Sequence, residues 1–290
     1  MPTYSTASTI LTQVRAECGV GSNPKSTALQ NTSLLRFLND INSEFVNLPY
    51  IQGLTGWKFL LRETIISTVA NTTLNGALAS GATSMVLTSG TSFDDPAATD
   101  VGAGYVKTGN SVYDFFTYED RATNTLSTVA GLNMAHATLE EVHKVYKLPS
   151  DFGKIRNIFR RSSLYSYVYV DPDFTQVPRG DQFTIRVFTS TNNYSASFLI
   201  FREDIGALEF KVQYVKAPTT IDETTDSVDA PDGTPRRYIV ERMKEYVWSH
   251  LGEENDAILA KQRADILLRE AFGEWAVQHV QPLQSIQLSW

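Results

Sequence analysis

Cysteine and histidine are scarce in this sequence. The 290 residues include one cysteine, Cys18, and four histidines that are scattered along the chain. A single cysteine cannot form an internal disulfide, and separated histidines lack the spacing of metal ligands. We therefore expect no disulfide, no metal site and no cofactor.

Long apolar runs are also missing. No stretch approaches the ~18 consecutive apolar residues that a membrane-spanning helix needs. The opening segment, MPTYSTASTI, has neither the basic nor the apolar region of a signal peptide. The sequence therefore predicts a protein that folds in a cytosol and does not contact a membrane.

Basic residues are not in excess. The chain has 25 lysines and arginines against 32 aspartates and glutamates, which gives a formal net charge of −7. This balance argues against a protein that wraps nucleic acid through phosphate contacts. It is compatible with a passage through which DNA slides, because like charge disfavours adsorption.

The motifs of common enzyme sites are absent too. The sequence has no G-x-S-x-G elbow, no H-E-x-x-H helix and no Walker loop. Acidic pairs such as Asp94–Asp95 and Glu253–Glu254 are better explained as solvated surface. Neighbours in a strand point to opposite faces, and acidic residues stabilise the start of a helix. We predict that the protein is not an enzyme and has no catalytic residues.

Helical periodicity is present near both ends of the chain. Helices are predicted over residues 5–19, 31–48, 234–252 and 255–278. In the last of these, the residues predicted to face inward are Ile258, Leu259, Ile266, Leu267, Ala271, Phe272 and Trp275.

Strand periodicity occupies the middle of the chain. Short strands separated by turn signals are predicted from Trp57 to about Tyr146, and a second set follows. The acidic connector at 217–233 has few apolar residues and is predicted to be a surface loop or linker.

These patterns predict an α+β fold. The economical packing brings the N- and C-terminal helices together as one helical bundle, with antiparallel β barrel or sandwich segments between them. The predicted domains are a bundle with a β segment over 1–75 and 149–281, an inserted small β module over 76–148, and an extended tail over 282–290.

The tail is unusually apolar for a chain end. Pro282 prevents the last helix from continuing. Apolar residues then alternate with polar ones, namely Leu283, Ile286, Leu288 and Trp290. Two interpretations stay open at this point: the tail packs on its own domain, or it docks on another molecule.

Two sets of short motifs follow one another along the chain. The first set consists of L-x-x-x-N followed by a later aromatic residue, then W-x-F, and then Y-x-L-P-x-D-F. The residues of this set are Leu35, Asn39, Phe45, Trp57, Phe59, Tyr146, Leu148, Pro149, Asp151 and Phe152. The second lies in the predicted β module and consists of L-x-x-G-A-T-S, F-x-Y and A-H-A, at Leu78, Gly81 to Ser84, Phe116, Tyr118 and Ala135 to Ala137.

In this order the motifs resemble those of the head-to-tail adaptor proteins of tailed bacteriophages, and the second set resembles small β domains of phage virion proteins. The resemblance implies a structural virion protein that forms a ring, commonly of twelve copies, at the head–tail interface. The implied partners are the portal protein, a tail or stopper protein, further copies of the chain, and genomic DNA that passes through without specific binding.

For the tail, the resemblance implies docking into the portal. Pro282, Leu283, Ile286, Leu288 and Trp290 would then be the docking residues. Two alternatives remain beside this expectation. One is a tail-side stopper, terminator or fibre-attachment component, and the other is a glycan-binding or glycan-hydrolysing β protein.

Overall fold

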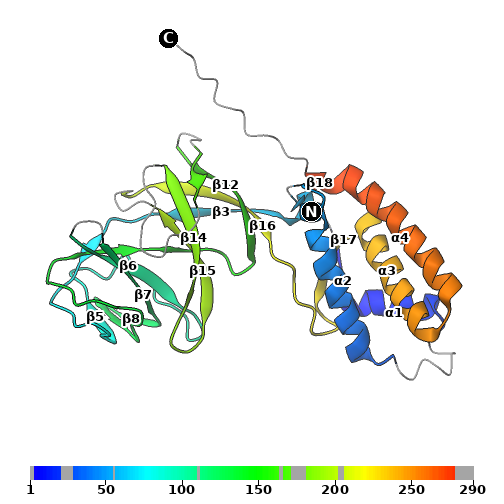
Figure 1. Ribbon diagram of the computed structural model, residues 1–290, viewed down its shortest axis with the longest axis horizontal. Helices are drawn as coiled ribbons and strands as arrows, with labels where there is room; N and C mark the ends of the chain where they lie inside the picture. Colours follow the sequence, from blue (N-terminus) through cyan, green and yellow to red (C-terminus); the bar gives the residue numbers. More distant parts are fainter. Residues whose placement is uncertain are drawn as a thin grey trace, which may run out of the picture. The chain divides into compact units, whose positions relative to one another are not determined.

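The computed structural model describes residues 3–20, 29–54, 56–109, 112–162, 166–170, 181–201 and 206–277. The chain divides into two compact units. The helical unit comprises Met1–Arg62 and Val215–Trp290, and the β unit comprises Glu63–Tyr214. The N-terminal and C-terminal helices therefore belong to the same unit, as the blue and orange segments in Figure 1 show.

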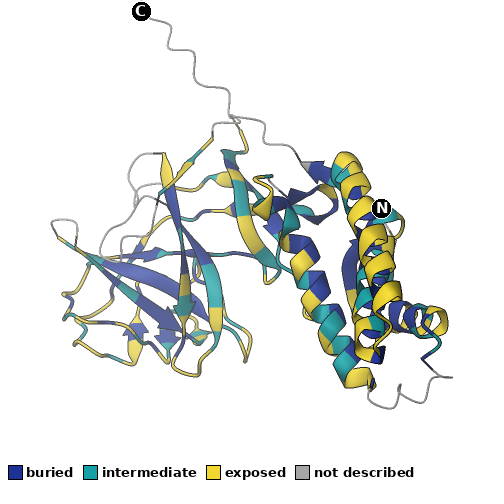
Figure 2. Cartoon of the chain, turned by 45° about the vertical axis from the view of Figure 1, so that its right-hand side comes forward, coloured by how far each residue is buried: buried dark blue, intermediate teal, exposed yellow. Residues whose placement is uncertain are grey.

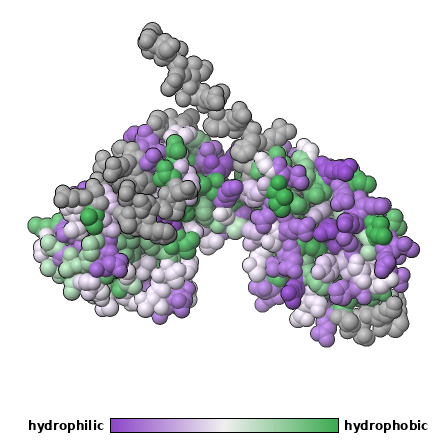
Figure 3. Space-filling view, viewed as in Figure 1, coloured by the Kyte–Doolittle hydropathy of each residue, from purple (hydrophilic) through white to green (hydrophobic). Residues whose placement is uncertain are grey.

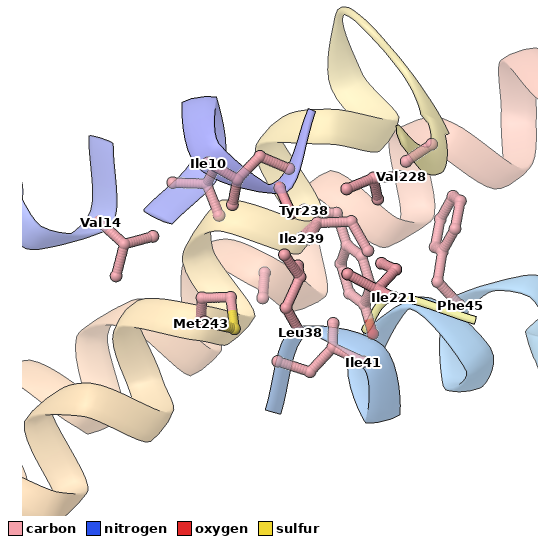
Figure 4. Packing of buried hydrophobic residues seen from close by; sticks show 14 of the residues in the cluster. Ile10, Val14, Leu38, Ile41, Phe45, Ile221, Val228, Tyr238, Ile239 and Met243 are labelled. Atoms are coloured by element: carbon pink, nitrogen blue, oxygen red, sulfur yellow. The ribbon is translucent and has the colours of Figure 1, made fainter. Parts of the chain in front are cut away.

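The described part of the helical unit contains four α-helices, which makes the fold mixed α+β as predicted. They are α1 (Ala7–Glu17), α2 (Asn31–Ile51), α3 (Thr234–Leu251) and α4 (Glu254–Trp275). All four contribute to one apolar core. Figure 4 shows its centre, with Ile10, Val14, Leu38, Ile41, Phe45, Ile221, Val228, Tyr238, Ile239 and Met243.

Small side chains close the hairpin of α3 and α4. α3 ends at Gly252, whose φ of 78° lies in the left-handed region that glycine adopts without a Cβ penalty. The buried residues of α4 are spaced alternately three and four apart, at Ala257, Ala260, Ala264, Leu267 and Ala271. Because alanines dominate this stripe, the distance between the two helix axes can be short.

This stripe corrects the predicted inner face of α4. Leu267 and Ala271 are buried as predicted, whereas Ile258, Leu259 and Ile266 are 54%, 48% and 57% exposed. The prediction for these three was wrong because it ranked residues by hydrophobicity. The alanines form the regular stripe, and the three larger residues lie outside it.

The acidic connector is a surface loop only in part: residues 222–225 are exposed, but the segment after them is not. Within it, β17 (Ser227–Pro231) pairs antiparallel with β1 (Tyr4–Thr6). Val228 and Ala230 are 1% and 0% exposed, and Ile221 is 2% exposed. The prediction was wrong because the acidic composition of the segment hid a short buried strand.

Four sheets are formed by described residues of the β unit. Two of them are antiparallel and come mainly from the predicted β module. One of these contains, in order, β4 (Thr72–Thr73), β10 (Glu141–Lys144), β6 (Gly102–Thr108) and β7 (Val112–Tyr118). The other contains β5 (Ser84–Val86), β9 (Thr125–Ser127) and β8 (Asp120–Ala122).

The other two sheets come mainly from the second set of strands. One contains β11 (Tyr146–Lys147), β15 (Ser195–Phe201), β14 (Gln182–Thr189) and β13 (Val168–Tyr169), with β13 parallel to β14. The other contains β12 (Phe152–Arg160), β16 (Glu209–Lys216) and β3 (Leu61–Ser67).

The two units differ in their boundaries from the predicted domains. The prediction combined residues 1–75 with 149–281 in one domain and set residues 76–148 apart as an inserted module. Residues 149–214 group with the β module, and the helices form a unit of their own. The reason is a shared core: Val101, Ala103, Tyr105 and Val145 of the module pack with Phe198 and Ile200 of β15. Across this contact the rings of Phe115 and Phe188 lie 5.9 Å apart. Aromatic burial of this size joins the two β segments.

The module depends on a glycine that makes room for an aromatic ring. A methyl group at Gly102 would collide with the ring of Tyr118, which is 1% exposed. We predict that Gly102→Ala destabilises the β unit by about 1–3 kcal/mol, because the ring cannot move in a packed core without strain. Denaturant unfolding measures this change.

The matched control for that variant is Gly109→Ala. A methyl group at Gly109 would meet no atom of the described residues within 4 Å, so its substitution should change the free energy of unfolding by less than about 0.5 kcal/mol. Equal effects of the two substitutions would contradict the packing described for Tyr118.

Candidate docking region

The predicted docking residues Pro282, Leu283, Ile286, Leu288 and Trp290 lie outside the described residues. The structure does describe the segment that immediately precedes them. After α4 the chain forms β18 (Ala276–Val277), which pairs antiparallel with β2 (Gly56–Trp57), Ala276 opposite Trp57. The starting point of the tail is therefore fixed within the helical unit.

A stack of aromatic rings supports this starting point. The ring of Trp57, 0% exposed, lies 4.6 Å from Phe45, 5.7 Å from Phe59 and 5.0 Å from Phe272. Its Nε1 donates a hydrogen bond of 2.7 Å to the Phe45 carbonyl oxygen. Trp57 and Phe59 form the W-x-F motif, with Lys58 to Leu60 as a 3-10 turn. The motif thus joins α2, β2 and α4.

The end of α4 is held by a polar contact as well. The Nζ atom of Lys58 donates to the carbonyl oxygen of Glu274 at 2.8 Å, which satisfies one of the last helical carbonyls. Trp275 meets Phe59 edge-on, with ring centroids 5.7 Å apart. Polar and aromatic contacts from the 3-10 turn at Lys58–Leu60 therefore fix the last turn of α4.

The motif residue Asn39 and its neighbour Asn42 dock the acidic connector on α2. Asn39 Oδ1 accepts from the Ile221 amide at 2.8 Å. Asn42, 0% exposed, donates through Nδ2 to Asp229 Oδ2 at 2.9 Å, and its Oδ1 accepts from the Asp229 amide at 2.9 Å. Sequence reasoning singled out Asn39 and missed Asn42, which lies one helical turn further on.

Asp229 is a buried carboxylate whose oxygens are well satisfied. Besides Asn42, it accepts from Lys216 Nζ at 2.8 Å, from Thr219 Oγ1 at 2.8 Å and from the Thr219 amide at 2.6 Å. A buried charge is tolerated only with such partners. This network joins α2, the connector and β17 in one place.

In the β unit, the Y-x-L-P-x-D-F residues also act as framework. Tyr146 Oη accepts from the Val69 amide at 2.9 Å, and burial raises the pKa of Tyr146 to about 12. Asp151 accepts from the Tyr214 hydroxyl at 2.8 Å, and Leu148 is 2% exposed. These contacts tie the motif to the neighbouring segments of the β unit.

Sequence reasoning missed a buried group in the β unit, in which His136 lies between the carboxyl groups of Asp114 and Glu140. His136 Nε2 lies 3.0 Å from Asp114 Oδ2, and His136 Nδ1 lies 2.8 Å from Glu140 Oε2. Asp114 also accepts from the amides of Asn133 and Met134. Since the His136 side chain is 0% exposed, the cluster ties the loop before β10 to β7. The only signal in the sequence was the A-H-A motif.

One cavity of the β unit has a volume of about 460 Å³ and is lined in part by Asp100, Lys147, Pro149, Phe152 and Val187. Its lysine and its carboxylate, Lys147 and Asp100, form an ion pair with each other. This lining offers one aromatic side chain and no carboxylate pair, so it gives little support to the glycan alternative.

In the part of the chain that the structure describes, no group of three or more histidine, cysteine or acidic side chains is placed to hold a metal ion. None of the described helices combines the length and the apolar character needed to span a bilayer.

Comparisons with known proteins add no relationship: no protein-family model matches the chain, and no curated protein matches its sequence. The proposed function therefore depends on the residues and their geometry.

The Asn42–Asp229 contact can be tested by stability. We predict that Asn42→Ala lowers the free energy of unfolding of the helical unit by about 2–4 kcal/mol, because it removes a donor from a buried carboxylate and an acceptor from a buried amide. Denaturant unfolding followed by far-ultraviolet circular dichroism measures this.

Asn47→Ala is the matched control. Asn47 lies on the same helix and is exposed, and within the described residues its side chain donates one hydrogen bond, to the Ser43 carbonyl oxygen. Its loss should therefore change the unfolding free energy by less than about 0.5 kcal/mol. If Asn42→Ala is as mild as this control, the network does not hold the connector.

Proposed function

We propose that this protein is a structural component of a phage virion, an adaptor that forms a ring between the capsid portal and the tail. The proposal rests on the order of the two motif sets together with one structural observation. The N- and C-terminal helices build one helical unit, and the last described strand before the apolar tail, β18, is fixed in that unit by its pairing with β2.

This observation favours docking of the tail on a partner. An extended segment that starts from a rigid anchor can enter apolar grooves or add a strand to a sheet edge. Leu283, Ile286, Leu288 and Trp290 supply the apolar anchors that such contacts use. Ordering a tail costs conformational entropy, and repetition around a ring offsets this cost through multivalency.

In this proposal the helical unit acts as a bundle that surrounds the DNA channel. Basic side chains of α3 are paired within the chain: Lys244 lies 2.9 Å from Glu17, and Arg242 contacts both Glu44 and Glu245. Paired cations have less charge to offer to phosphates. Together with the net charge of −7, this suits a channel that DNA crosses without adhering.

In this proposal the β unit contacts a tail or stopper protein. The ring would consist of copies of this chain alone, with twelve copies as the number that the adaptor resemblance implies. The alternative, a tail-side stopper, terminator or fibre-attachment component, differs in predicting a threefold or sixfold ring.

Removal of the tail tests the docking residues. We predict that a chain truncated after Gln281 binds the purified portal protein at least about 100-fold more weakly, since several apolar anchors of about 2 kcal/mol each are lost. Its melting temperature should stay close to that of the full chain. Binding is measured by surface plasmon resonance and melting by calorimetry.

The control retains the tail and replaces its polar residues Gln284 and Gln287 with alanine, which should leave portal binding nearly unchanged. Undiminished binding by the truncated chain would overturn the docking proposal. A large drop in its melting temperature would do so as well, because it would show that the tail is part of the folded core.

A further inference from the structure

One edge of β15 loses its strand partner part-way along its length. On this edge β11 pairs with the middle of β15, and the last bond of the ladder runs from the Leu148 amide to the Ser197 carbonyl oxygen at 2.9 Å. The chain then turns, since the Phe152 amide donates to the Pro149 carbonyl oxygen at 3.0 Å, and it continues as β12 in another sheet. The ladder therefore stops before it reaches the first residues of β15.

The backbone groups of Ser195 point to this open edge. On the other edge, where β14 and β15 lie side by side in Figure 1, the Ser190 amide donates to the Tyr194 carbonyl oxygen at 2.8 Å. Residues of an antiparallel strand bond alternately to its two sides, so Ser195 and Ser197 face away from β14. Within the described residues, neither the amide and carbonyl of Ser195 nor the amide of Ser197 has a hydrogen-bond partner. An exposed edge of this kind is a template for a further strand.

A cavity lies beside the open edge. It is the cavity of about 460 Å³, which is lined by Pro149 and Phe152 from the turn and by Ser195 and Ser197 from β15. Sites that bind small ligands typically have volumes of roughly 300–1,000 Å³. Ser195 is exposed, and Figure 2 shows exposed segments at the ends of several strands of the β unit. The cavity thus offers room for a short extended segment where the ladder ends.

The side chains around the edge favour a segment that is apolar on one face. Val187 is 67% exposed and pairs directly opposite Ser197, so the two side chains share a face of the sheet. Serine is small, and a large apolar side chain on an added strand can pass over Ser197 to contact Val187. The same face of the added strand therefore needs an apolar residue, and successive residues of a strand alternate between faces.

Charge in the cavity favours a neutral occupant. Lys147 and Asp100 line the cavity and form an ion pair with each other, so their charges are already compensated. On the face of the β unit that Figure 3 displays, apolar and polar residues alternate over short distances. Recognition by backbone hydrogen bonds and alternate side chains suits such a surface better than recognition by charge.

We propose that this edge of β15 binds an extended, uncharged segment of another protein, in which apolar and polar residues alternate. The segment adds a strand to the sheet beyond Leu148, exchanges hydrogen bonds with the backbone of Ser195 and places an apolar side chain against Val187. The proposal concerns the β unit alone and does not depend on the adaptor function.

Five peptides with blocked ends test the site. Their sequence is Gln-Thr-X-Thr-X-Thr-Gln, where X is valine, isoleucine, leucine, phenylalanine or tyrosine, and the fluorescence anisotropy of an attached fluorescein measures their binding to the full chain. We expect saturable binding of at least one peptide. In that peptide, N-methylation of one alternate set of amides should weaken binding at least about 10-fold and methylation of the other set less than about 2-fold, because only every second amide of a strand faces its neighbour.

Ser195→Pro tests the same edge from the protein side. Proline at this position removes an amide that faces away from β14, and its ring obstructs an added strand while the β14 ladder stays intact. We expect Ser195→Pro to bind the peptide at least about 10-fold more weakly, whereas the matched control Ser195→Ala, which keeps the amide, should bind within about 2-fold of the native chain. Circular dichroism checks that both variants are folded.

Val187→Lys supplies an independent variant, because its exposed side chain can be replaced without disturbing the core. It should weaken binding of the same peptide at least about 5-fold, since the apolar contact is lost.

Three results would overturn the proposal. The first is that none of the five peptides binds at concentrations up to about 1 mM. The second is equal affinity of Ser195→Pro and Ser195→Ala for the peptide, and the third is an equal effect of the two methylated sets. None of these measurements involves the portal, so the strand-binding edge and the adaptor function fail separately.

Discussion

The buried carboxylate of Asp229 is the group on which the helical unit depends. A charge with 3% residue exposure is stable only when its oxygens are satisfied, and Asn42, Lys216 and Thr219 supply the donors. The same contacts fix the path from β16 to α3. They place the two C-terminal helices against α2, and through α4 they set the point from which the tail departs.

Much of the fold could be predicted from periodicity. The helices near both ends, the strands between them and the mixed α+β class follow from the spacing of apolar residues. The inner face of α4 could not be read that way, because Ala260 and Ala264 are weakly hydrophobic but complete a regular stripe. The buried strand at Val228 was hidden by acidic neighbours, whose significance depends on Asn42, far away in sequence. The grouping of the β segments depends on aromatic contacts such as Phe115 with Phe188, which a linear pattern does not reveal.

The motif residues turn out to be framework in this structure. Trp57 and Asn39 connect segments that are distant in sequence, and Asp151 links the turn before β12 to β16. The candidate site itself, the tail, was found from Pro282 and the alternating apolar residues after it. Its partner cannot be derived from sequence, because an apolar tail suits an intramolecular surface and a foreign groove equally well.

The most direct test of the adaptor proposal is the mass of the complex that the purified protein forms with purified portal, measured by native mass spectrometry. We predict a stable ring with one copy of this chain for each portal subunit. A folded protein with an intact tail that forms no complex with the portal would contradict the proposal, as would a ring of threefold or sixfold symmetry that forms without the portal.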